Sequence, residues 1–144
     1  MFGGILDMAF NNRVDMIKAL KKSVIPYLRE YGFKGSFPHF RRRNEEYIDL
    51  ITFQFNRYGG SFVVELAFCP KEGVTMSWGE EVPPNKVTAH DINDRYRLKE
   101  SKDEYETWFD YENAQCEEDL NLIALKVKSL LHVSDYNWIK NLFN

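Results

Sequence analysis

Two β-type runs flank the adjacent glycines Gly59 and Gly60, and this arrangement constrains the fold more than any other feature of the chain. Adjacent glycines supply the positive φ angles that a tight hairpin needs, so 57–60 is predicted to be a hairpin loop. Strands joined by so short a loop must be antiparallel, because a parallel pair needs a long crossover. The sequence therefore predicts an antiparallel hairpin with strands over 47–56 and 61–69.

The strand over 61–69 has two different faces, because successive side chains of a strand point to opposite sides. One face is wholly apolar and consists of Phe62, Val64, Leu66 and Phe68. The other face is mixed and consists of Ser61, Val63, Glu65, Ala67 and Cys69. We expect the apolar face to pack against helices and Pro70 to end the strand.

A helix is predicted over 12–31, because apolar residues recur there at spacings of three and four. The stripe consists of Val14, Ile17, Leu20, Val24, Leu28 and Tyr31. Gly32 and Phe33 suit a Schellman end, with Gly32 at positive φ and Phe33 closing back on Leu28. Pro26 lies inside this segment, so a kink or a break is expected there.

A second helix is predicted over 114–131, with Asn113 as its N-cap. Its apolar stripe consists of Leu120, Ile123, Ala124, Val127, Leu130 and Leu131. Ser134 is predicted to cap a short last helix. Additional extended segments are expected over 36–43, 74–78 and 107–111.

These elements predict an α+β fold: an antiparallel sheet of about four to five strands, with two long helices and a short C-terminal helix packed on one face. A chain of 144 residues fits one domain, which we expect to comprise an N-terminal extension, 1–11, and a globular core, 12–144.

Composition limits the classes of partner. The net charge of −3 lacks the basic excess of nucleic-acid binders, so no nucleic acid is expected. No apolar run reaches the length of a membrane span, so we expect no membrane contact and a cytoplasmic location. Cys69 and Cys116 are expected to be reduced, buried and non-catalytic, since Glu117 and its acidic neighbours would raise the thiol pKa of Cys116.

No catalytic, metal or phosphate-binding motif is present, so no catalytic residue, metal ligand or cofactor is assigned. The nearest approach to a ligand cluster is His90 and Asp91 with Asp94. Arg95 and Tyr96 occupy positions where a calcium loop needs an oxygen ligand and a glycine. We therefore interpret this segment as a polar loop that caps its own backbone.

The candidate binding residues are arginines and tryptophans, which dominate binding hot spots. Arg41, Arg42 and Arg43 form the one basic run; they could grip a phosphate or an acidic partner, but pairing with Glu45, Glu46 or Asp49 is favoured. The region 78–111 combines arginines with aromatic residues, which suits either a binding surface or an aromatic core. The candidates are Arg42, Trp78, Arg95, Arg97 and Trp108.

Residues from about Met16 to Tyr111 resemble a bacterial family called domain of unknown function 4304 (DUF4304). The resemblance rests on the order of five segments: 28–34, LREYGFK; 37–42, FPHFRR; 53–62, FQFNRYGGSF; 95–98, RYRL; and 108–111, WFDY. Trp78-Gly79 continues it. The resemblance implies a small bacterial domain with no established activity, so it assigns no catalytic residue. Residues 1–11 lie outside the family pattern.

The hypothesis drawn from these observations is a non-enzymatic domain that contacts a protein partner, in an immunity-like or regulatory role. The alternative is a small-ligand binder, or an enzyme of unrecognised type, that uses the region 78–111. A homodimer through the N-terminal segment is also considered, because Phe2, Ile5, Leu6, Ala9 and Phe10 form an apolar stripe.

Overall fold

The computed structural model describes residues 12–101 and 105–144, so the apolar stripe over 2–10 lies outside the described residues. The elements run in the order α2 (Asn12–Glu30), β1 (Lys34–Ser36), β2 (His39–Arg43), β3 (Tyr47–Phe55), β4 (Ser61–Pro70), β5 (Val74–Thr75), β6 (Glu81–Val82), η1 (Ala89–Asp91), β7 (Tyr96–Arg97), β8 (Phe109–Asp110), α3 (Glu117–Leu130) and α4 (Trp138–Asn141).

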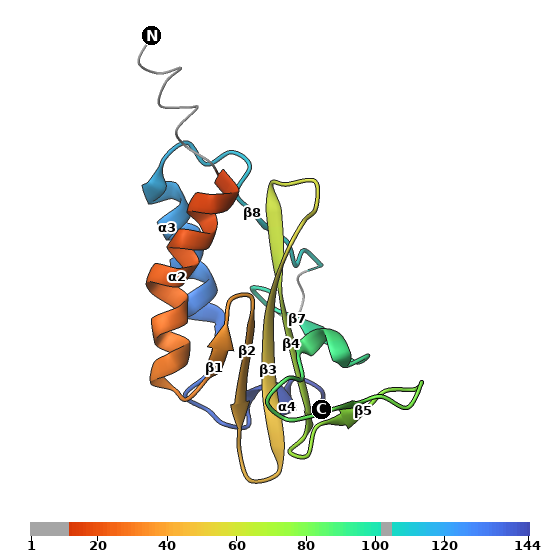
Figure 1. Cartoon of the computed structure of the whole chain (residues 1–144). Helices are drawn as coiled ribbons and strands as arrows, with labels where there is room; N and C mark the ends of the chain where they lie inside the picture. Colours follow the sequence, from red (N-terminus) through yellow and green to blue (C-terminus); the bar gives the residue numbers. More distant parts are fainter. Residues whose placement is uncertain (1–11, 102–104) are drawn as a thin grey trace.

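The described strands form one six-stranded sheet and one separate hairpin. The sheet has the order β1-β2-β3-β4-β7, and β8 also pairs with β4. Every pairing is antiparallel, and β5 pairs with β6 alone. Figure 1 shows α2 and α3 on one side of the sheet and the β5–β6 hairpin on the other. The predicted α+β architecture is confirmed.

The hairpin of β3 and β4 is the longest pairing of the sheet. Its register runs from Tyr47 opposite Pro70 to Phe55 opposite Phe62. Gly59 and Gly60 both have positive φ, 90° and 83°, as the hairpin prediction requires. The predicted extended segment over 36–43 is wrong in one respect, because the chain reverses at Phe37-Pro38 and forms two strands. Proline cannot donate a ladder hydrogen bond, which suits a turn between strands.

The end of α2 is the predicted Schellman motif. The N–H of Phe33 donates to the carbonyl of Leu28 at 3.0 Å, and that of Gly32 donates to Arg29 at 3.1 Å. Gly32 has φ 92°, the conformation that only glycine adopts at low cost. The predicted break at Pro26 is absent, since α2 runs through this exposed proline to Glu30.

The structure corrects the predicted helices at three residues, Val14, Asn113 and Ser134. Val14 is 48% exposed, because the buried face of the first turns of α2 runs through Met16 and Ala19 instead. Asn113 is not an N-cap: α3 begins at Glu117 after Cys116, since the chain first makes a turn in which Ala114 N–H donates to the carbonyl of Tyr111.

Ser134 does not cap the last helix. The N-cap of α4 is Asn137, and a turn precedes it in which Trp138 N–H donates to the carbonyl of Asp135 at 3.0 Å. The Asp135 side chain accepts the N–H of Asn137 at 2.9 Å. A local side-chain bond of this kind offers the backbone an alternative to helix, which delays the start of α4.

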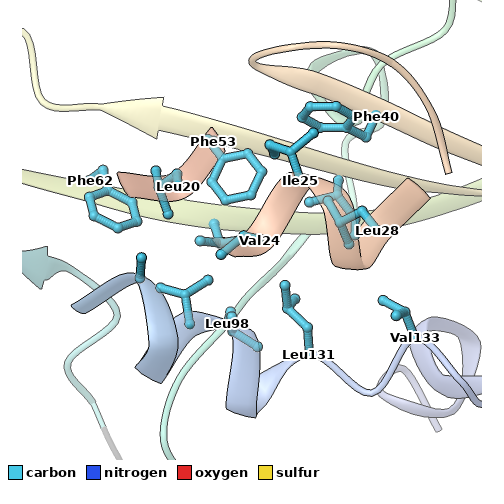
Figure 2. Close-up of a cluster of buried hydrophobic side chains, with 14 of the residues drawn as sticks. Leu20, Val24, Ile25, Leu28, Phe40, Phe53, Phe62, Leu98, Leu131 and Val133 are labelled. Carbon is cyan, nitrogen blue, oxygen red and sulfur yellow. The ribbon is translucent and has the colours of Figure 1, made fainter. Parts of the chain in front are cut away.

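The main core lies between the sheet and the helices. Figure 2 shows side chains of α2, of the sheet and of the segment around Leu131 pointing toward one another. The predicted apolar face of β4 lies here, since Phe62, Val64 and Leu66 are fully buried in this cluster and Phe68 packs against it. A second, smaller cluster covers part of the opposite face and consists of Ile48, Leu50, Ala67, Cys69, Val87 and Ala89.

Both cysteines are free, but only Cys69 is buried. Burial raises the pKa of its thiol to about 11, with nearby Asp91 adding to the rise. Cys116 is exposed at the start of α3, so the expectation that it is buried is wrong. Within the described residues, no helix combines the length and the hydropathy needed to cross a membrane.

Replacement of Leu66 by alanine should lower the free energy of unfolding by about 2–5 kcal/mol, because this side chain is fully buried in the main core. Leu122 is a matched control at 61% exposure, and its replacement by alanine should cost no more than about 0.5 kcal/mol. Urea denaturation of both variants measures the two losses. Equal losses would show that the face assignment of β4 is wrong.

Thiol titration of the native protein should show one fast thiol and one that reacts only on unfolding. The fast thiol is the exposed Cys116, and the slow one is Cys69, which is buried and has a raised pKa. Cys116→Ser should abolish the fast phase. A fast phase that survives in this variant would contradict the burial of Cys69.

Candidate functional site

Four neighbouring strands place a polar residue at the same level of the sheet. His39 lies opposite Thr52, Thr52 lies opposite Glu65, and Glu65 lies opposite Arg97. Residues directly opposite each other on paired strands share a face. The neighbouring residue Leu66 lies in the main core. This polar row therefore lies on the face of the sheet that α2 and α3 do not cover.

Glu65 is the acid of this row, and it is only 2% exposed. Its Oε2 accepts a hydrogen bond from Arg95 Nε at 3.0 Å and lies 3.7 Å from Arg97 Nε. Its Oε1 lies 3.4 Å from His90 Nε2, but this contact lacks hydrogen-bond geometry, so the oxygen is buried without a hydrogen-bond partner among the described residues. One buried carboxylate thus lies within ion-pair distance of three basic side chains.

The basic side chains reach the surface from this buried anchor. The side chains of Arg95 and Arg97 are 33% and 40% exposed. Arg95 is held further, because its Nη1 donates to the carbonyls of His90 and Ile92. The guanidinium of Arg97 lies 5.4 Å from the centre of the Trp108 ring, within the range of a cation–π contact. We call Glu65, His90, Arg95, Arg97 and Trp108 the basic–aromatic cluster.

His39 extends the cluster along the polar row. Its Nδ1 lies 2.9 Å from Thr52 Oγ1, and its ring packs edge-on against His90 with 5.5 Å between centres. Burial lowers the pKa of His39, and the nearby His90 and Arg41 lower it further against the opposing effect of Asp91. Its lowered pKa favours the uncharged form of His39.

The structure brings together three of the predicted candidates and separates the other two. Arg95, Arg97 and Trp108 lie together in the basic–aromatic cluster. Trp78 is 69% exposed in the connection between β5 and β6. Figure 1 shows this hairpin projecting away from β7 and β8. Trp78 is therefore not part of the cluster.

Arg42 lies on the opposite face of the sheet and is 2% exposed. It pairs with its cross-strand neighbour Asp49, with Nη2 donating to Oδ2 at 3.0 Å. Its guanidinium lies between the rings of Phe33 and Tyr136, at 4.6 Å and 4.2 Å from their centres. The pairing with Asp49 is the structural role that the sequence favours for this arginine.

Arg42 also connects distant segments of the chain. Its Nη1 donates to the backbone carbonyl of Tyr31, after α2, and to that of Val133, before α4. A guanidinium occupied by these acceptors has little capacity left for a partner. Arg42 therefore contributes to the fold and not to a binding surface.

Sequence reasoning missed the residue that organises the cluster. Glu65 is the one charged residue on the mixed face of β4, and its basic partners lie at least 25 residues further along the chain. The available signal was a single acid in an otherwise buried strand, since buried charges are paired in folded proteins. That signal predicts a basic partner without saying which one.

The segment around His90 caps its own backbone, as the sequence indicates. Oδ2 of Asp91 accepts the N–H of Thr88 at 2.9 Å and lies 3.4 Å from the Thr88 hydroxyl. Across 12–101 and 105–144, no group of three His, Cys, Asp or Glu side chains is arranged to hold a metal ion.

Protonation of Asp49 should make stability depend on pH. Burial raises the pKa of Asp49 from 3.8 to about 6, although the hydrogen bond and charge of Arg42 oppose the rise. The folded state therefore holds this proton more tightly than the unfolded state. The stability that Asp49 contributes is fully present below pH 3.8 and is lost as the pH rises through about 6.

Urea denaturation of the native protein and of Asp49→Asn between pH 4 and pH 7 measures this effect. Relative to the variant, the native protein should lose roughly 2 kcal/mol across this interval. The prediction is contradicted if the difference in unfolding free energy between the native protein and Asp49→Asn stays constant with pH, or if it shifts in favour of the native protein as the pH rises. Either result would show that Arg42 lowers the pKa of Asp49 at least as much as burial raises it.

The comparisons with known proteins concern the same part of the chain. Residues 24–140 match the family described as Domain of unknown function (DUF4304). The match covers well over half of the 144 residues, includes the whole basic–aromatic cluster, and extends beyond Tyr111 through α3. No curated protein and no solved structure matches the chain. The resemblance found in the sequence is confirmed, and the chain belongs to the DUF4304 family.

Proposed function

We propose that this domain is a non-enzymatic binding module that contacts a protein partner through the basic–aromatic cluster. The observation that supports the proposal is the anchoring of Arg95 and Arg97 on a buried carboxylate, with both guanidinium groups reaching the surface. Side chains held in place lose less conformational entropy on binding than free ones. Anchored arginines beside a tryptophan have the composition of a hot spot.

The charge of the cluster indicates the chemistry of the partner. Two arginines share the single carboxylate of Glu65, so the cluster carries an excess of positive charge. A carboxylate of the partner would complete this arrangement, because guanidinium groups bind carboxylates through paired hydrogen bonds. The partner surface is therefore acidic at its centre and apolar where it meets Trp108. A regulatory or immunity-like role follows if binding blocks an activity of the partner.

A cytoplasmic location is part of the proposal. The exposed Cys116 is free, and free exposed thiols persist in reducing compartments. Binding through the basic–aromatic cluster does not require a reducing compartment, so the cytoplasmic location is tested separately from the binding.

A second candidate function, binding of a small ligand in the region 78–111, is favoured by one groove. It has a volume of about 340 Å³ and is lined by Glu100, Trp108, Phe109, Asp110, Leu122, Ile123 and Lys126. A volume in this range suits a small molecule. However, Lys126 and Glu100 pair with each other at 2.6 Å, so these two charged groups of the groove are already matched.

Arg97→Ala should weaken partner binding by about 2 kcal/mol or more, as loss of a hot-spot arginine does. Stability should change by less than about 1 kcal/mol, because Arg97 is partly exposed and Arg95 still pairs with Glu65. The immobilised domain captures partners from a lysate of the source cells, and calorimetry on the recovered partner measures the affinity.

Arg57→Ala is the matched control, since Arg57 also lies over an aromatic ring, that of Tyr58, but in the β3–β4 loop. A genuine partner should be retained by this variant and lost by Arg97→Ala and Trp108→Ala. Equal recovery by all variants would reject the cluster as the binding centre. A large drop in melting temperature for Arg97→Ala would show instead that Arg97 is structural.

A further inference from the structure

A second basic site lies beside the strand β2 and shares no residue with the basic–aromatic cluster. Gly32, Lys34, Arg41, Arg43, Pro84 and Asn85 line a groove of about 360 Å³. We call it the basic groove. Its floor is the edge of the sheet formed by β1 and β2, and its wall is the segment that precedes η1.

Three cations converge in the basic groove. Lys34 lies directly opposite Arg41 in the sheet, and Arg43 lies two residues further along the same face. Like charges directly opposite each other on paired strands are destabilising. No carboxylate of the described residues lies within ion-pair distance of any of the three. The concentration of positive charge is notable in a chain whose net charge is −3.

Arg41 is positioned before any ligand arrives. Its Nε donates to the backbone carbonyl of Val87 at 3.0 Å, which fixes the guanidinium against the wall of the groove. Its two terminal nitrogens have no acceptor among the described residues. Arg42 and Arg95, in contrast, are each paired with a buried carboxylate. The basic groove therefore contains a held guanidinium whose outer donors are free.

We propose that the basic groove binds a phosphate-bearing small molecule, with a phosphoryl group between Arg41, Arg43 and Lys34. A guanidinium matches the oxygens of a phosphate through two parallel hydrogen bonds, and a lysine adds a compact charge. Two or three cations balance the charge of one or two phosphoryl groups. The volume of the groove is that of a small-molecule site rather than of an extended polymer track.

This inference is independent of the proposed function, because the basic groove and the basic–aromatic cluster share no residue. Loss of partner binding in Arg97→Ala leaves the groove intact. Loss of phosphate binding in a groove variant leaves Glu65 and its partners intact. Each failure is therefore recognisable on its own.

Calorimetric titration of the full chain with inorganic pyrophosphate and with adenosine monophosphate tests the proposal, at constant ionic strength set by sodium chloride. Saturable binding with a Kd below about 1 mM is expected for at least one of them. Arg43→Gln and Lys34→Gln should each weaken it by about tenfold, the effect of one charge-assisted hydrogen bond. Both positions are exposed, so these variants should fold. Arg57→Gln should bind as the native protein does.

Two results would overturn the proposal. The first is the absence of saturable binding for both probes, or binding that all three variants retain equally. The second is tight, steeply salt-dependent binding of a short single-stranded oligonucleotide with no binding of the small probes, because that result would assign the groove to a nucleic-acid surface. When one of the small probes binds, Arg41→Gln locates the phosphoryl group within the groove, with the melting temperature of this variant as a folding check.

Discussion

The register of the β3–β4 hairpin is the constraint on which the rest of the structure depends. Because side chains alternate along a strand, a slip of one residue would exchange the two faces of the sheet. The observed register pairs Ile51 with Leu66 in the main core and Thr52 with Glu65 on the opposite face. The apolar face is buried under α2 and α3, and this burial selects the register. The same register brings Glu65 level with Arg97.

Each face of the sheet contains one buried acid, and the two acids have opposite consequences. Asp49 pairs with Arg42, which is 2% exposed and also donates hydrogen bonds to the surrounding backbone carbonyls. That pair joins the hairpin of β2 and β3 to both helical regions. Glu65 instead pairs with Arg95 and Arg97, whose side chains remain 33% and 40% exposed. The first pair is closed within the fold, whereas the second leaves two arginine side chains partly exposed.

The sequence predicted the features that depend on local pattern. Burial and backbone geometry act over a few residues, so these features were recognisable in the sequence: the alternation over 61–69, the Schellman end at Gly32 and Phe33, and the stripe of α3. The start of α3 was missed because the chain makes a turn from Tyr111 to Ala114 before the helix begins at Glu117. Glu65 was missed because its partners lie far along the chain, and Trp78 was grouped with Trp108 on sequence proximity alone. The spatial separation of these tryptophans follows from β5 and β6 forming their own hairpin.

Glu65 holds the arginines of the basic–aromatic cluster in place, and nuclear magnetic resonance of arginine side chains tests this role directly. The Nε–H of Arg95 donates to Glu65 at 3.0 Å, so its proton should exchange with water more slowly than that of Arg57 in the exposed loop. Glu65→Gln should accelerate this exchange while amide protons of the main core, such as that of Phe62, keep their protection. Exchange of the Arg95 proton as fast as that of Arg57 in the native protein would contradict the claim.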